Sequence, residues 1–163
     1  MLRFKPQLII FLSGLPYFLA GIMLNRKGVN FISEATSLAG ELPSLTLPFV
    51  RPLTSLFGDA TMAMIFLVII ALVTGVFKGR KVIVPGVERN LLRLQAETNP
   101  IPLTQTYDRK GWIILGVMMT LGMLINNLPV PIDVRGFVDV AVGVALIQGG
   151  VASLRVYRSL KTA

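Results

Sequence analysis

The sequence predicts an all-α fold: an integral membrane four-helix bundle with two short interfacial amphipathic helices, forming a single transmembrane domain over residues 1–163. Four apolar stretches are each close to the roughly 20 residues that a helix needs to cross a bilayer. Only 15% of the residues are charged, against about 25% in soluble domains. Nine of the ten prolines fall outside the four stretches, as expected if the stretches are helices.

The clearest predicted span is 60–77. It carries no charge, and at about 1.5 Å per residue it reaches roughly 27 Å, close to the thickness of a hydrocarbon core. Asp59 precedes it, where a carboxylate can accept hydrogen bonds from the free N–H groups of the first helical turn. A basic segment follows at once and predicts the end of the span at a membrane surface.

The first predicted span is 7–24, which follows a basic N-terminus. No A-x-A cleavage site follows it, so we interpret it as an uncleaved span rather than a signal peptide. Pro16 lies in its middle and predicts a kink. Gly14 and Gly21 are seven residues apart and share one helical face, which predicts close packing against another helix.

The connection between these two spans predicts the first interfacial helix. Residues 32–42 place apolar side chains on one helical face and Ser and Glu on the other, a pattern typical of a short amphipathic helix. Three prolines follow, so 45–56 is predicted to be irregular or re-entrant. They are Pro43, Pro48 and Pro52.

Residues 78–110 form the most polar segment and are predicted to be a cytoplasmic connection. Within it, 87–98 has an apolar face and a charged face, which predicts the second interfacial helix. The basic side chains of this segment are expected to contact lipid headgroups. The candidates for this contact are Lys78, Arg80, Lys81, Arg89 and Arg93.

The last two predicted spans are 111–126 and 136–154, joined by a connection so short that they should form an antiparallel hairpin. Glycines recur every seven residues in the last span, at Gly136, Gly143 and Gly150. Such a stripe favours helix packing or a partner interface. It also brings backbones close enough to admit a ligand, which we regard as the less favoured interpretation.

Asp139 is the one acidic residue inside a predicted span, and a carboxylate within a membrane is by default a functional hypothesis. Arg135 lies one helical turn earlier, so the structural alternative is a salt bridge near the helix entrance. We favour the salt bridge. Gln148, deeper in the span, is expected to form an interhelical hydrogen bond.

The distribution of Lys and Arg predicts the orientation of the chain. With four spans, 12 of the 16 basic residues lie on the side that holds both termini and the middle connection, and 4 lie on the other side. The positive-inside rule therefore places both termini in the cytoplasm. We expect a multi-pass protein of the cell inner (plasma) membrane, although a thylakoid-type membrane would give the same pattern.

Several classes of chemistry are excluded by composition. The chain contains no Cys and no His, which removes disulfides, thiolate nucleophiles, the usual zinc sites and histidine catalysis. The eight acidic residues are scattered singly, so we expect no metal, no cofactor and no enzymatic activity. The net charge of +8 lies at the ends of apolar runs and points to lipid headgroups rather than nucleic acid.

One resemblance adds to this interpretation. The segments LSGLPYFLAGIMLNRKG (12–28) and LTLPFVRPLTSLFGDA (45–60), and the second span closed by FKGRK, are similar to the DoxX-like family of small four-helix bacterial membrane proteins. The similarity covers roughly the first half of the chain. It implies an accessory membrane subunit, in some cases associated with oxidoreductase or quinone-linked systems, and implies no catalytic residues.

Three functions stay open at this point. The favoured one is a non-catalytic accessory or assembly subunit of a larger membrane complex. The second is a small transporter or channel that uses Asp139. The third is a DoxX-like partner of a membrane oxidoreductase or quinone-linked system. The expected partners are membrane lipids and other integral membrane subunits, with a homo-oligomer as a further possibility.

Overall fold

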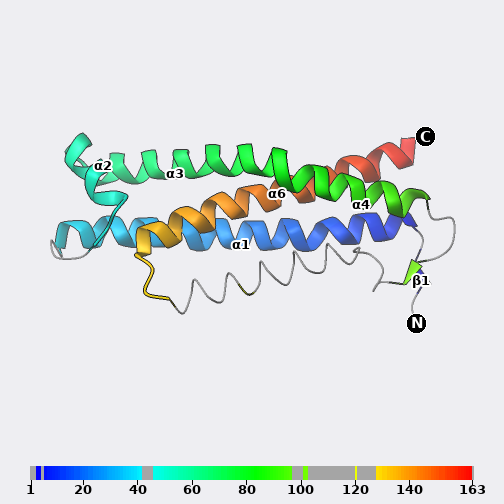
Figure 1. Ribbon diagram of the computed structural model, residues 1–163, viewed down its shortest axis with the longest axis horizontal. Coiled ribbons are helices and arrows are strands. Elements are labelled where there is room, and N and C mark those ends of the chain that lie inside the picture. The colour runs from blue at the N-terminus through cyan, green and yellow to red at the C-terminus, as the bar shows by residue number, and fades with distance from the viewer. Residues whose placement is uncertain are drawn as a thin grey trace.

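The computed structural model describes residues 3–4, 6–41, 46–96, 101–102, 120 and 128–162. This part of the chain is all-helical apart from short connections and one pair of two-residue strands, and its long helices lie side by side along one axis (Figure 1). The helices are α1 (Pro6–Glu41), α2 (Val50–Phe57), α3 (Ala60–Lys78), the π-helix η1 (Gly79–Ile83), α4 (Val84–Ala96) and α6 (Ile132–Thr162); the strands β1 (Arg3–Phe4) and β2 (Ile101–Pro102) pair antiparallel.

Two helical segments are long and apolar enough to cross a membrane: Ala60–Leu92 and Ile132–Ser159. They include the predicted spans 60–77 and 136–154. The predicted span 111–126 lies outside the described residues except for Thr120, and so does the predicted hairpin between the last two spans.

Helix α1 corrects the prediction of a span followed by a separate interfacial helix. It runs unbroken for 36 residues, through Pro16 and well beyond residue 24. Its C-terminal half does not lie on a surface by itself, because Ile32 and Ala35 are fully buried in the core of the bundle. The apolar face of 32–42 is therefore a packing face, since tertiary contact extends the helix past the polar residues that mark the end of the predicted span.

The segment after α3 corrects a second prediction. Instead of a polar connection with its own interfacial helix, the chain continues as helix through η1 into α4. Pro85 accounts for the π-helical turn: it has no N–H to donate, and its ring would clash with the carbonyl of Lys81 in a regular α-helix. The Val84 N–H donates to Gly79 O, five residues back, which widens the turn.

Helix α2 replaces the irregular segment expected over 45–56. Pro52 is its third residue, where a proline is tolerated because N–H groups of the first turn have no partner within the helix. Gly58 ends the helix in the left-handed conformation, with φ of 67°, and its N–H donates to Thr54 O. The predicted cap of the next helix is confirmed, because Asp59 Oδ1 accepts a 2.9 Å hydrogen bond from the Thr61 N–H.

A buried carboxylate joins α2 to α6. Asp133, in the first turn of α6, is 0% exposed. Its Oδ2 accepts hydrogen bonds from the N–H groups of Phe49 (2.7 Å) and Val50 (3.1 Å), and its Oδ1 accepts one from the Val134 N–H (2.8 Å). Two helix N-termini thus share one carboxylate, which satisfies their free donors and complements their positive ends.

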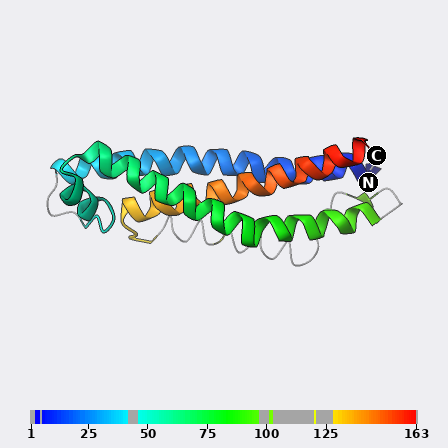
Figure 2. The same cartoon turned by 90° about the horizontal axis from the view of Figure 1, so that it is seen from above.

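Helix α6 is the central element of the described bundle. It lies between α1 on one side and the helix formed by α3, η1 and α4 on the other (Figures 1 and 2). Its Val140 is fully buried with Ile32 of α1 and Ala71 of α3. The N- and C-terminal ends and α4 lie at one end of the bundle, and α2 lies at the opposite end (Figure 1).

The role of Asp133 can be tested with Asp133→Ala. This change leaves the Phe49 and Val50 amides buried without their acceptor, so we expect the free energy of unfolding in detergent to fall by about 2–4 kcal/mol. The matched control is Asp59→Ala, which removes an exposed cap and should cost only about 1 kcal/mol. Equal losses for the two variants, measured by thermal unfolding, would contradict the account of α2.

Candidate functional site

Helices α1 and α6 meet along glycine-lined faces. A Cβ atom added at Gly21 would lie 2.6 Å from Gly143 O, and one added at Gly28 would lie 2.8 Å from Gly136 O. Contacts this short leave no room for a methyl group, so the two backbones touch directly. The three pairs run in antiparallel order: Gly14 with Gly150, Gly21 with Gly143, and Gly28 with Gly136.

The structure brings together all five glycines that the sequence marks as a packing or partner interface, and it adds Gly28. A seven-residue repeat keeps small residues on one seam along both helices, as in a coiled coil. Gly28 continues the spacing of Gly14 and Gly21, which is the signal that identifies it. It was missed because the polar residues just before it mark the end of the predicted first span.

A second face of α6 packs closely against the other long helix. A Cβ atom at Gly75 would lie 2.5 Å from Ala141 O, and one at Gly79 would lie 2.9 Å from the Cα atom of Ala145. Gln148 Nε2 donates a 3.4 Å hydrogen bond to Gly75 O. This interhelical bond lies one turn before the π-helix η1, so α6 contacts the long helix close to the point where its helical geometry changes.

A polar cluster lies beside the α1–α6 contact. Two cationic side chains make cation–π contacts with the Phe31 ring of α1. Lys27 Nζ lies 5.3 Å from the ring centroid, and Arg135 Cζ of α6 lies 5.7 Å from it. Arg135 Nη2 also donates a 3.2 Å hydrogen bond to Leu128 O. Cation–π contacts of this kind stabilise charges that are partly removed from water.

Asp139 lies one turn along α6 from Arg135. Arg135 Nη2 donates to Leu128 O, and the charges of both Lys27 and Arg135 act on the Asp139 carboxylate. Asp139 Oδ2 is buried and accepts no hydrogen bond from any residue that the structure describes. The cluster therefore contains a buried carboxylate oxygen without a described hydrogen bond, and Lys27 and Arg135 supply the positive charge near it.

The basic side chains expected at lipid headgroups lie beyond the apolar part of α3. Lys78, Arg80, Lys81 and Arg89 are exposed. Lys81 Nζ lies 4.3 Å from the centroid of the Phe77 ring, and Arg89 Nε donates to Pro85 O. Arg93 belongs to α4, but its side chain is outside the described part.

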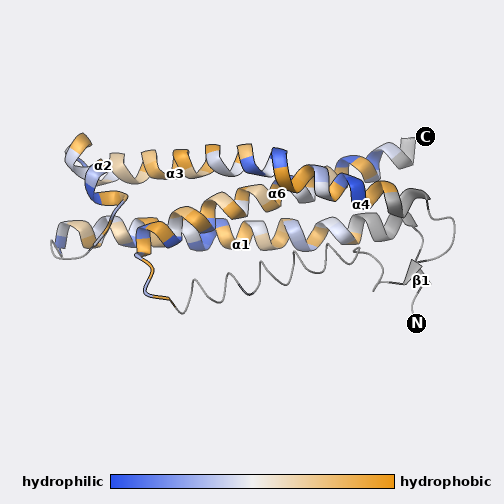
Figure 3. Cartoon of the chain, viewed as in Figure 1, coloured by the Kyte–Doolittle hydropathy of each residue, from blue (hydrophilic) through white to orange (hydrophobic). Residues whose placement is uncertain are grey.

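Helices α3 and α1 are rich in apolar residues (Figure 3), and several of their large apolar side chains are exposed. On α3, Val73 is 63% exposed and Met62 is 55% exposed; on α1, Met23 is 73% exposed and Leu19 is 53% exposed. Groups of large exposed apolar side chains mark surfaces that contact lipid or another protein.

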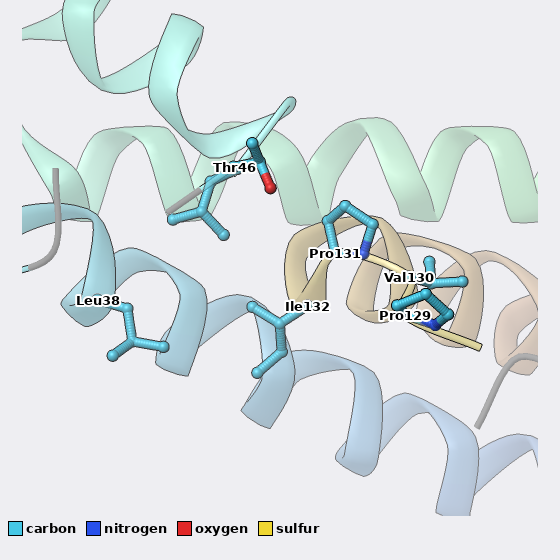
Figure 4. A pocket seen from close by; sticks show the side chains of 7 residues that line it. Leu38, Thr46, Pro129, Val130, Pro131 and Ile132 are labelled. Atoms are coloured by element: carbon cyan, nitrogen blue, oxygen red, sulfur yellow. The ribbon is translucent and has the colours of Figure 1, made fainter. Parts of the chain in front are cut away.

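A pocket of about 390 Å³ opens where the C-terminal part of α1 meets the N-terminus of α6 (Figure 4). Its described lining residues are uncharged: Leu38, Thr46, Leu47, Pro129, Val130, Pro131 and Ile132. It holds no group that suits acid–base or metal chemistry. In the parts of the chain that the structure describes, no three His, Cys, Asp or Glu side chains gather as a metal site would require.

The chain was compared with protein-family models, with curated proteins and with solved structures, and none of them matches it. Any functional assignment therefore rests on the residues and their geometry.

The glycine interface can be tested with Gly143→Ala. The added methyl group would press on the Gly21 backbone and on Asn25, so we expect a loss of about 1–3 kcal/mol in the free energy of unfolding. Gly40→Ala is the matched control in α1, because a Cβ atom there meets nothing within 4 Å; it should be neutral or slightly stabilising. An equally mild effect of both changes in thermal unfolding would contradict the close contact.

Proposed function

We propose that this chain is a multi-pass membrane protein, with four spans in a helix bundle, that acts as a non-catalytic accessory or assembly subunit of a larger membrane complex. The observation that carries this proposal is that the inner and outer faces of the helices differ in their contacts. Two faces of α6 are taken up by glycine-mediated contacts with α1 and α3, while the outer faces of α1 and α3 present large apolar side chains. Those outer faces suit lipid and partner helices.

The polar groups also favour a subunit over an enzyme. Two polar contacts between elements of the described part are structural: Asp133 accepts from the N-terminus of α2, and Gln148 Nε2 donates to the Gly75 carbonyl. Any chemistry would then come from a partner. Membership of the DoxX-like family, and with it a link to a membrane oxidoreductase or quinone, rests on the sequence resemblance alone.

The direct test is purification of the tagged protein from its native membrane in a mild detergent, with a multi-pass protein carrying the same tag as control. We expect co-purification in one large complex with partner proteins in fixed stoichiometry. Recovery of the chain alone, or as a homo-oligomer, would contradict the subunit proposal. Bound quinone or pigment on the isolated chain would instead support the oxidoreductase alternative.

We further propose that both termini lie in the cytoplasm, in the inner membrane. The distribution of Lys and Arg supports this orientation. In the structure, α4 and both termini lie at one end of the bundle, and α2 lies at the opposite end (Figure 1). Lys78, Arg80 and Lys81 would then meet the anionic cytoplasmic leaflet.

This topology can be measured by thiol labelling, because the chain has no native cysteine. Ser159→Cys lies near the C-terminus and Ser55→Cys lies on α2; both positions are exposed. In intact cells, a membrane-impermeant maleimide should label Ser55→Cys and should reach Ser159→Cys only after lysis. The reverse pattern would place the termini outside, and equal labelling would contradict the spans.

A transporter is the second candidate, and the buried, unsatisfied Asp139 Oδ2 favours it. On the subunit proposal, Asp139→Asn should leave co-purification of partners intact, and reconstituted vesicles should pass no more protons or cations than empty ones. Asp59→Asn, at an exposed cap, is the control. Flux that is present in the unaltered protein, lost in Asp139→Asn and kept in Asp59→Asn would establish the transporter instead.

A further inference from the structure

Two cationic side chains from different helices lie beside one aromatic ring. Lys27 Nζ of α1 and Arg135 Cζ of α6 lie 5.3 Å and 5.7 Å from the centroid of the Phe31 ring. Like charges that share one small site repel each other. An anion placed between them offsets this repulsion and gains from both charges.

Asp139 supplies one negative charge at this place, and we call the four residues the Phe31 cluster. The charges of Lys27 and Arg135 both act on the Asp139 carboxylate. The Asp139 Oδ2 atom is buried, so it is turned towards the protein, whereas the Lys27 side chain is exposed. The cluster therefore carries one net positive charge, and an exposed cation presents it to the surroundings.

The cluster lies where the sequence predicts a membrane surface. Lys27 follows the predicted span 7–24, and Arg135 directly precedes the predicted span 136–154. Because α1 and α6 run antiparallel and are in contact at this point, the end of one predicted span meets the start of the other. Phospholipid headgroups lie at the surface of the hydrocarbon core, so the cluster would lie among phosphate groups.

An exposed apolar ridge leads away from the cluster along α1. Leu15, Leu19 and Met23 precede Lys27 at intervals of four residues, and side chains at this spacing form one ridge on a helix. All three apolar side chains are exposed. From Leu15 to Lys27 the helix rises by roughly 18 Å, close to half of a hydrocarbon core that is about 30 Å thick. The ridge is therefore about as long as one leaflet is deep.

We infer that the Phe31 cluster and this ridge form a binding site for one anionic phospholipid. Its phosphate lies at Lys27 and Arg135, and an acyl chain follows Met23 and Leu19 into the bilayer. Lys and Arg bind phosphate oxygens through charge-assisted hydrogen bonds. The net positive charge of the cluster favours an anionic lipid over a zwitterionic one. This inference rests on the proposed membrane insertion.

The site differs from the headgroup contacts expected at the basic segment that follows α3. That segment attracts anionic lipids through a row of exposed cations on one helix. The Phe31 cluster joins cations of two helices to an aromatic ring and an apolar ridge. It therefore predicts one preferred lipid, on the membrane side opposite to Lys78 in the proposed topology.

The test is lipid binding by the full chain, purified in a mild detergent and titrated with phosphatidylglycerol or phosphatidylcholine under native mass spectrometry. We expect one phosphatidylglycerol molecule to bind more tightly than further copies and more tightly than phosphatidylcholine. Lys27→Gln should weaken this first binding about five-fold, because one cation at a membrane surface is lost. Lys27→Arg should retain it.

The matched control is Arg26→Gln. Arg26 is also exposed, but neighbouring residues of an α-helix point about 100° apart, so Arg26 lies off the ridge. Its loss should leave the first binding unchanged. Equal weakening by Lys27→Gln and Arg26→Gln, or equal affinities for the two lipids, would overturn the inference in favour of general headgroup attraction.

The acyl-chain contact is tested with Met23→Ser, and Val73→Ser on α3 is its control, because both positions are exposed. Only Met23→Ser should weaken the first binding. Glycerol 3-phosphate, which carries the phosphate without acyl chains, should not displace the lipid. Equal affinities of the two variants, or displacement by glycerol 3-phosphate, would overturn the lipid site in favour of a site for soluble phosphates.

Failure of this site and failure of the membrane proposal give different results. Thiol labelling of Ser55→Cys and Ser159→Cys does not depend on lipid selectivity. Lost selectivity together with the expected labelling pattern would overturn the lipid site alone. Labelling that contradicts the spans would overturn the membrane proposal and the lipid site with it.

Discussion

The close contact between α1 and α6 is the constraint on which the rest of this structure depends. Membrane helices gain little from the hydrophobic effect between themselves, so association relies on close packing, and glycine permits the closest approach. Three glycine pairs set the antiparallel register of α1 and α6. Gly75 of α3 and Gly79 of η1 allow an equally close contact on another face of α6. With α6 occupied on both faces, the large apolar side chains of α1 and α3 are left to the surroundings, which is why lipid and partner helices are the proposed environment.

Much of this organisation is local in the sequence and could be predicted. The uncharged run before Lys78 identifies α3, and Asp59 stands where a cap belongs, as the structure confirms. The seven-residue glycine spacing identifies the faces of α1 and α6 that meet. What spacing alone does not reveal is the partner of each face, and the described glycine contacts join α6 to the first helix of the chain.

The features that escaped prediction depend on contacts distant in sequence. Asp133 resembles an ordinary loop acid, and its role appears only when Phe49 and Val50, more than 80 residues earlier, lie against it. Helix α1 continues past Lys27 because tertiary packing of Ile32 outweighs a local polar signal. Pro85 suggests the end of a helix, but a π-helical turn accommodates it. In each case the local pattern is real and the packing overrides it.

The register of α1 against α6 is the central claim, and disulfide trapping in native membranes tests it most directly. A Cβ atom at Gly14 would lie 2.5 Å from the Cβ atom of Ser153, so a small opening of the contact brings a Gly14→Cys, Ser153→Cys pair to the roughly 3.8 Å of a disulfide. Mild oxidation should form an intramolecular bond in this pair and not in the control Gly14→Cys, Ser159→Cys. No bond in the first pair, or equal bonding in both, would contradict the account.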